Sequence, residues 1–187
     1  MRINYWLARI CVLLALPLGA LALLPADLPV RGYIVGGALY QTAGSQLNLQ
    51  DLSALAGELK LNGRVGFTGF VHDPAAAMRA LDIVVHASIE PEPFGRVIVE
   101  GMACGRAVIA SRAGGVVEII NEGTDALGHK PGDANMLADC IKQLVLDKDL
   151  RARLGLAGRR TAELRFDRQR LAGELLPLYQ RLAEEIV

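Results

Sequence analysis

The chain has 187 residues, of which 52% are hydrophobic and 21% charged, so it is long enough to bury the core of one α/β domain and too apolar to be disordered. Its twenty basic residues balance twenty acidic ones, which excludes a strong overall attraction to nucleic acid. Three widely spaced cysteines, Cys11, Cys104 and Cys140, form no C-x-x-C pair. This argues against a disulfide framework or a zinc knuckle and favours a reducing compartment.

The beginning of the chain is its most apolar part. The stretch WLARICVLLALPLGALALLP carries a single charge, on Arg9, and lies ahead of every acidic residue. Such a stretch is typical of an export signal or a marginal membrane span, and also of a buried helix interrupted at Pro17 and Gly19. We therefore expect residues 1–25 to form an atypical hydrophobic segment, separate from a domain over residues 26–187.

From Val30 onward, short apolar runs alternate with stretches of helical periodicity, a pattern typical of a parallel sheet flanked by helices. The predicted elements are, in chain order, a strand over 31–37, a helix over 47–60 capped by Asn48, a strand over 64–69, a helix over 73–81, a strand over 82–88, a helix of about nine residues from Gly95, strands over 107–111 and near Leu127, and helices over 134–146 and from Lys148 onward. The fold class is thus α/β, with C-terminal helices after the sheet.

Local signals place some of the helix ends. Asp73 followed by Pro74 predicts a capping side chain and a proline at the first helical position. Gly105 is expected to end the helix before it. Pro177 is expected to kink or split the last helix.

The turn EPFGRVIVE joins a predicted strand to a predicted helix and carries the most specific chemistry. Ligands of an open parallel sheet collect where strands end and helices begin. Gly95 permits close backbone approach, and the free amides of residues 95–98 point out of the helix end, where the helix dipole favours a phosphate. The sequence has neither a lysine-bearing phosphate loop nor a G-x-G-x-x-G motif, so backbone amides would hold the phosphate.

Two glutamates flank this helix end. Glu92 precedes the helix, and Glu100 lies about 7 Å further along its axis. Carboxylates accept paired hydrogen bonds from vicinal hydroxyls, so the arrangement suits a diphosphate with a sugar on either side, as in a nucleotide-sugar. Two other interpretations stay open. The glutamates could be a helix-terminal charge and a surface residue, or they could form a glycosidase pair.

The three histidines, His72, His86 and His129, are far apart and share no metal-ligand spacing. We therefore expect neither a metal site nor a bound cofactor. His86 falls in a predicted strand and is expected to be a core or rim residue.

Several motifs follow one another in the order and spacing of family-4 glycosyltransferases with two Rossmann-like domains: FTGFVHD, LDIVVHAS, EPFGRVIVEGMACGRAVIASRAGGVVEII and KPGDANMLADCI. From about Gly19 to its end, the chain resembles the C-terminal, donor-binding half of these enzymes. The resemblance implies a single Rossmann-like domain. It also implies retaining transfer of a hexose from a nucleoside-diphosphate sugar, without an essential metal, in polysaccharide biosynthesis.

The resemblance further implies roles for individual residues. Glu92, the catalytic candidate, would bind the transferred sugar, and Glu100 would bind the ribose hydroxyls. Val71 would contact the base through its backbone. The other donor-binding residues that the resemblance implies are the backbone around Phe94, Gly95 and Val97, the neighbouring Pro93, and Gly36 and Gly37 at the end of the first predicted strand.

Two departures from the family pattern lower the activity that we expect. In the family an upstream strand and loop supply an arginine and a lysine to the diphosphate, whereas here that region offers only Arg2 and Arg9. The acceptor-binding N-terminal domain, about as large again, does not occur in the sequence. We therefore expect a truncated product that binds the donor weakly and transfers little alone.

The expected partners are a nucleotide-sugar, a glycan or lipid-linked acceptor, and a missing N-terminal domain or a second copy, but not nucleic acid. The expected location is the cytoplasm, and an arginine-rich tail leaves peripheral membrane contact open. Two other function classes also stay open. One is a non-catalytic nucleotide-sugar-binding fragment that needs a partner domain, and the other is an exported or membrane-anchored globular protein.

Overall fold

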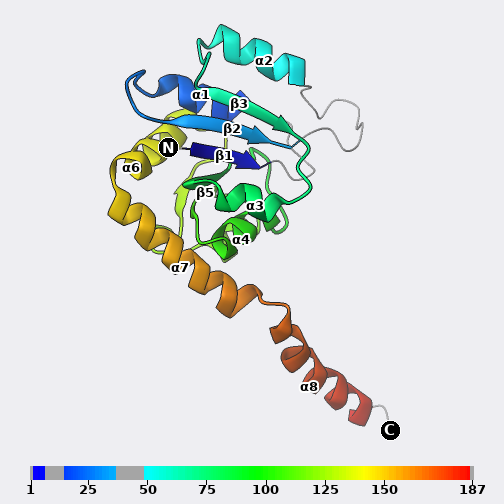
Figure 1. Ribbon diagram of the computed structural model, residues 1–187. Coiled ribbons are helices and arrows are strands. Elements are labelled where there is room, and N and C mark those ends of the chain that lie inside the picture. Colours follow the sequence, from blue (N-terminus) through cyan, green and yellow to red (C-terminus); the bar gives the residue numbers. More distant parts are fainter. Residues whose placement is uncertain (1, 7–14, 37–48, 186–187) are drawn as a thin grey trace.

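The computed structural model describes residues 2–6, 15–36 and 49–185, which form an α/β fold around a six-stranded sheet (Figure 1). Its strands are β1 (Arg2–Trp6), β2 (Arg31–Val35), β3 (Val65–Gly69), β4 (Ile83–His86), β5 (Ala107–Ser111) and β6 (Leu127–His129). They lie in the order β3-β2-β1-β4-β5-β6, and all five pairings are parallel. This is the strand order of a doubly wound Rossmann sheet, which confirms the expected fold class.

Helices cover both faces of the sheet (Figure 1). They are α1 (Ala15–Leu23), α2 (Leu49–Glu58), α3 (Pro74–Arg79), α4 (Arg96–Ala103), α5 (Val116–Ile119), α6 (Ala134–Leu146), α7 (Lys148–Phe166) and α8 (Gln169–Glu185). One core cluster joins α1, α2 and α6 to the sheet, and the other joins α3, α4 and the short α5. Among the described residues, no helix has both the length and the apolar character that a membrane crossing requires.

The residues of strand β4 show why helices must bury both faces of the sheet. All four of its residues are buried. Ile83 and Val85 belong to one core cluster and Val84 to the other, because successive side chains of a strand point to opposite faces. A continuous run of apolar β-branched residues is what a central parallel strand requires.

Strand β1 was not predicted from the sequence. It lies at the centre of the sheet, where the backbone of Ile3 pairs with Gly32 of β2 and with Ile83 of β4. Its five residues, RINYW, run into the apolar stretch without a turn residue that would mark where the strand ends. Only its pairing with β2 and β4 in the structure shows that β1 is a central strand.

The apolar stretch after β1 contains a buried helix. Helix α1 runs through Pro17 and Gly19, so the interruption expected there is wrong. Pro17 lies in the first helical turn, where a missing N–H costs no intrahelical hydrogen bond. Leu18 and Leu21 are fully buried in the same cluster as α6. Residues 18–24 of the apolar stretch thus contribute to the core that α6 shares with the sheet.

Several helix ends follow the local signals. Asp73 accepts a hydrogen bond from the amide of Ala76 over 2.8 Å, and Pro74 opens α3 as predicted. Asp133 caps α6 in the same manner, and α6 has the predicted bounds. Gly105, with φ 66°, follows the C-terminal end of α4, where a left-handed glycine is expected.

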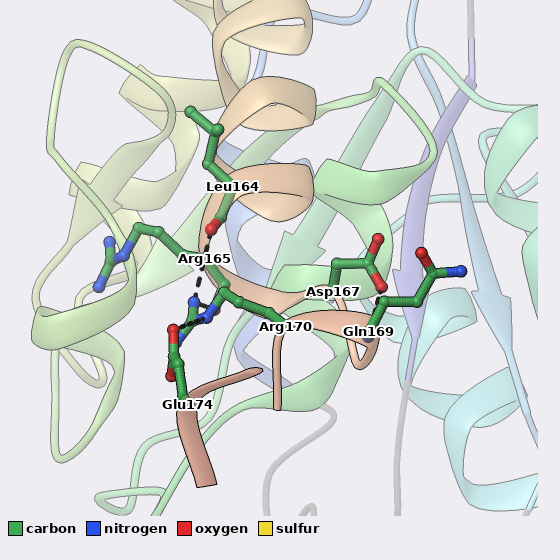
Figure 2. Close-up of polar contacts among 6 residues, drawn as sticks. All are labelled: Leu164, Arg165, Asp167, Gln169, Arg170 and Glu174. Atoms are coloured by element: carbon green, nitrogen blue, oxygen red, sulfur yellow. Dashed lines mark hydrogen bonds and ion pairs between the residues drawn. The ribbon is translucent and has the colours of Figure 1, made fainter. Parts of the chain in front are cut away.

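The C-terminal tail breaks at a different place from the one expected. Helix α8 continues through Pro177, and the break between α7 and α8 lies at Asp167 and Arg168. The Asp167 carboxylate accepts a hydrogen bond from the amide of Gln169 over 2.9 Å (Figure 2). An aspartate that binds an amide two residues ahead favours a turn over a continued helix, so Asp167 was the stronger signal.

Arg170 fastens the start of α8 to the end of α7 (Figure 2). Its guanidinium donates hydrogen bonds to the carbonyl oxygens of Leu164 and Arg165. It also pairs with Glu174, one turn further along α8, over 2.6 Å. The last carbonyls of α7 are thus satisfied by a side chain of the next helix.

Candidate functional site

The structure places the predicted site residues at one edge of the sheet. Gly36 ends β2, Val71 follows β3, and the turn 92–100 follows β4, so all lie at the carboxyl ends of parallel strands. The strand order reverses between β1 and β4, and ligands of doubly wound sheets bind outside that point. Four other residues named from the sequence lie outside the described residues: Arg9, Cys11, Gly37 and Asn48.

Helix α4 begins at a glycine in the left-handed conformation. Gly95 has φ 70° and ψ 56°, and a Cβ there would lie 3.0 Å from the Ile98 side chain. The Ile98 amide donates to the Gly95 carbonyl over 3.0 Å, so the expectation that all amides of 95–98 are free is wrong at Ile98. The amides of Gly95, Arg96 and Val97 have no intrahelical acceptors. Together with the helix dipole they suit an anion.

The side chain of Val97 is buried, with 3% exposed. Only its backbone can therefore face a ligand, as the expected role requires. Pro93 and Phe94 are exposed on the other side of Gly95. The Phe94 ring packs edge to face against Phe166 at the end of α7, with ring centroids 5.8 Å apart.

Two glycines after β5 hold the backbone of Glu92. The Gly115 amide donates to the Glu92 carbonyl over 2.8 Å, and Glu92 forms a β-bridge with Gly114. A Cβ on Gly114 would lie 2.4 Å from the Glu92 carbonyl oxygen, and one on Gly115 would lie 2.1 Å from that of Pro93. No larger residue fits at either position. The sequence shows the glycine pair but not what approaches it.

The Glu92 carboxylate lies beside a buried histidine. The Glu92 side chain is 25% exposed, and its Oε1 lies 3.2 Å from Nε2 of His86. His86 ends β4, and its Nδ1 accepts a hydrogen bond from the Ser111 amide over 3.3 Å. Its side chain is 5% exposed, as expected of a core or rim residue. Its contact with Glu92 was not predicted from the sequence, because a separation of six residues across a turn carries no periodic signal.

Glu100 lies one helical turn after Arg96 on the exposed flank of α4. The two side chains form an ion pair over 3.2 Å, with 77% of the Arg96 side chain and 37% of the Glu100 side chain exposed. Exposed pairs of this kind contribute little to stability, so a ligand can displace Arg96 at small cost. The two glutamates thus flank the α4 N-terminus, one before it and one on its first turns.

Within the described residues, no group of three or more His, Cys, Asp and Glu side chains is placed to hold a metal ion. Burial raises the pKa of the Cys140 thiol to about 11 and also raises the pKa of Cys104. Both thiols therefore stay protonated at neutral pH and act as packing groups.

Comparison with known proteins identifies the family. The sequence matches the glycosyl transferases group 1 family over residues 16–161. The chain belongs to this family. Two relatives are the lipopolysaccharide core biosynthesis glycosyltransferase LpsE of Rhizobium meliloti and N-acetyl-alpha-D-glucosaminyl L-malate synthase of Bacillus anthracis. LpsE is 35% identical over 128 residues, which cover 68% of this chain and 37% of LpsE. The synthase is 30% identical over 125 residues, which cover 67% of this chain and 32% of the synthase.

Solved structures share the fold of this group 1 glycosyltransferase domain. Anabaena HepE in complex with UDP is 33% identical, with a TM-score of 0.79 over 98% of this chain and 48% of HepE. A glycosyltransferase from Rickettsia africae is 27% identical, with a TM-score of 0.84 over 97% of this chain and 48% of that protein. The group 1 domain described here therefore spans less than half the length of each of these proteins.

Proposed function

We propose that this group 1 chain binds a nucleoside-diphosphate sugar and is the donor half of a retaining, family-4 glycosyltransferase that transfers a hexose to a glycan or lipid-linked acceptor. The observation that carries the proposal is the position of Glu92 and Glu100 on either side of the α4 N-terminus, at the point where the strand order reverses. HepE has been solved in complex with UDP and with UDP-glucose, which supports a nucleotide-sugar as the ligand.

In this proposal the diphosphate lies against the amides of Gly95, Arg96 and Val97. Glu92 accepts hydrogen bonds from the hexose hydroxyls, and Glu100 accepts them from the ribose hydroxyls after it releases Arg96. Both carboxylates then stay away from the phosphates, which they would repel. The base lies towards Val71, beyond β1.

Transfer breaks the bond between the sugar C1 and a diphosphate oxygen and forms a bond from C1 to an acceptor hydroxyl oxygen. Negative charge develops on the departing diphosphate, which takes up the proton of that hydroxyl. Amides and a helix dipole that already point at this position stabilise that charge without reorganisation. Glu92 holds the hexose while the bond breaks. The proposed reaction needs no metal ion or cofactor, and the nucleotide-sugar is a substrate.

A second candidate function is donor binding without transfer by this chain alone. Its support is the share of the relatives that the chain covers, which is 37% of LpsE and 48% of HepE. In this alternative the residues around the α4 N-terminus hold the donor, and a partner domain supplies the acceptor site. Sugar transfer by the purified chain, measured without any partner, would contradict this alternative.

Isothermal titration against UDP-, GDP- and ADP-sugars tests the proposed donor site, with Glu100→Ala as the informative variant. We expect at least one nucleotide-sugar to bind, and Glu100→Ala to weaken that binding about tenfold, because the ribose loses a charge-assisted acceptor. Glu163→Ala is the matched control, since Glu163 forms a similar ion pair one turn from Arg159. Binding that Glu100→Ala leaves unchanged would refute the ribose assignment.

A further inference from the structure

Three polar side chains lie buried behind Glu92, at or near the carboxyl ends of three neighbouring strands. They are His86 on β4, Ser111 on β5 and His129 on β6, with exposed fractions of 4%, 1% and 0%. Buried polar groups cost free energy unless they are hydrogen-bonded. None of the three has a part in the donor contacts proposed above, so their arrangement calls for a separate explanation.

The hydrogen bonds of His86 fix the position of its ring proton. Its Nδ1 accepts the amide hydrogen of Ser111, so Nδ1 carries no proton of its own. A neutral imidazole has one N–H, which must therefore be on Nε2. This nitrogen lies 3.2 Å from Oε1 of Glu92. The His86 ring thus presents a donor to the carboxylate.

The contact between His86 and Glu92 is close but incomplete. The separation is within ion-pair range, but the contact does not meet hydrogen-bond geometry, and Nε2 has no hydrogen-bond partner among the described residues. A hydrogen bond between them therefore requires the partly exposed Glu92 carboxylate to turn towards Nε2. His86 itself is held in place, because its backbone pairs with Ala110 of β5 and its Nδ1 accepts a hydrogen bond from the Ser111 amide.

The second oxygen of Glu92 faces a different way. Oε2 lies near Gly95, where a Cβ would be 3.6 Å from it, at the start of α4. With Oε1 beside His86, Oε2 remains for a ligand at the helix end. The His86 side chain is 5% exposed, so it acts on a ligand through Glu92.

We propose that His86 is a positioning residue that fixes the Glu92 carboxylate in the orientation in which it accepts hydrogen bonds from the transferred sugar. The inference rests on the proposed function, because it needs a donor sugar beside Glu92. The proposal predicts that His86 contributes to binding of the sugar part of the ligand and does not contribute to binding of the nucleotide part.

The experiment compares a nucleotide-sugar with its free nucleoside diphosphate by isothermal titration of the full chain. The probes are UDP-glucose, GDP-mannose and ADP-glucose, each beside UDP, GDP or ADP, and the best-bound pair is used for the variants. His86→Leu should weaken nucleotide-sugar binding about tenfold and leave nucleoside diphosphate binding unchanged. His86→Gln, which keeps an N–H donor of similar reach, should retain most of the affinity.

Two further variants test whether His86→Leu weakens binding only because it disturbs the packing of the core. Glu92→Gln does not alter the core and should reproduce the loss on the sugar end, and adding His86→Leu to it should cause little further loss. Val85→Ala is the matched control, since Val85 is the buried neighbour of His86 in β4. It should lower stability and leave the ratio of the two affinities unchanged.

The possible outcomes distinguish the proposed donor site from the positioning role of His86. If the unaltered chain binds a nucleotide-sugar but His86→Leu weakens both ligands equally or neither, the positioning role is refuted and the donor site stands. If the unaltered chain binds none of the six ligands, the proposed function is contradicted and the positioning role falls with it.

Discussion

His129 is fully buried at the end of β6, with a carbonyl oxygen beside each ring nitrogen. Nδ1 lies 2.9 Å from the Lys130 oxygen and Nε2 lies 3.2 Å from the His86 oxygen. A neutral ring can donate to only one of them, whereas a protonated ring could donate to both. Burial nevertheless lowers the pKa of His129 below 6.5, so the neutral ring prevails at pH 7.

This lowered pKa makes the stability of the fold depend on pH. The folded chain takes up the His129 proton at a lower pH than the unfolded chain does. The contribution of neutral His129 to the free energy of unfolding is therefore fully present above pH 6.5, and it is lost as the pH falls through the folded pKa. His129→Leu should cost about 1–3 kcal/mol at pH 7.5, because one buried carbonyl oxygen loses its donor. The difference from the unaltered chain should shrink towards pH 5 in urea titrations. Parallel pH profiles would contradict this prediction.

At the scale of single residues, the sequence identified Glu92 and Glu100 but not their neighbours. A glutamate on each side of a strand-to-helix turn is visible in the order of the letters. The contacts of Glu92 with His86 and Gly114 depend on how β4 and β5 lie side by side, which a single sequence does not state. The glycine pair after β5 is visible in the sequence, but only the structure shows that it makes room for Glu92 and Pro93.

Helix α7 carries two glycines whose lack of a side chain lets its backbone pack closely against neighbouring backbone. A Cβ on Gly155 would lie 2.6 Å from the carbonyl oxygen of Gly105, and one on Gly158 would lie 3.0 Å from that of Asp125. Glycine normally weakens a helix interior relative to alanine. Close packing of α7 on the sheet and α4 therefore outweighs helix propensity at these positions.

Gly155→Ala should lower the free energy of unfolding by about 1–3 kcal/mol, since the new methyl group meets a backbone oxygen that cannot move aside cheaply. Gly173→Ala in α8 is the control, because nothing lies within 4 Å of a Cβ there. It should leave the stability unchanged or raise it by up to about 1 kcal/mol. Urea unfolding followed by circular dichroism measures both. A Gly155→Ala variant as stable as the parent would show that α7 packs differently.

At the scale of elements, prediction succeeded where one local signal had one meaning. The cap at Asp73 and the 3.6-residue period of 134–146 gave helices at the observed places. Prediction failed where two signals competed. Pro177 predicted a helix break that the structure has at Asp167. The apolar run that begins near Trp6 gave no sign of the central strand before it. A local hydrogen bond from the Gln169 amide to Asp167 decided the first case, and pairing of β1 with β2 and β4 decided the second.

At the scale of the whole molecule, α8 extends away from the body of the domain (Figure 1). Leu175, Leu178 and Leu182 recur on it at helical spacing with 43%, 46% and 54% exposed. An apolar stripe of this kind on an extended helix favours association. We therefore expect the chain to associate with itself when no other partner covers α8.

Analytical ultracentrifugation over a range of concentrations tests this expectation. The mean mass of the unaltered chain should rise with concentration, and Leu178→Glu with Leu182→Glu should keep the chain monomeric, because charged side chains resist burial. Gln180→Glu, on the opposite side of α8, should associate like the unaltered chain. Equal association of all three proteins would exclude the leucine stripe as the contact.

A crystal structure of the chain with UDP-glucose tests the central claim most directly. The account predicts diphosphate oxygens within hydrogen-bond distance of the amides of residues 95–97, ribose hydroxyls at Glu100 and glucose hydroxyls at Glu92. A nucleotide bound away from the α4 N-terminus, or bound there with both glutamates turned to solvent, would contradict it.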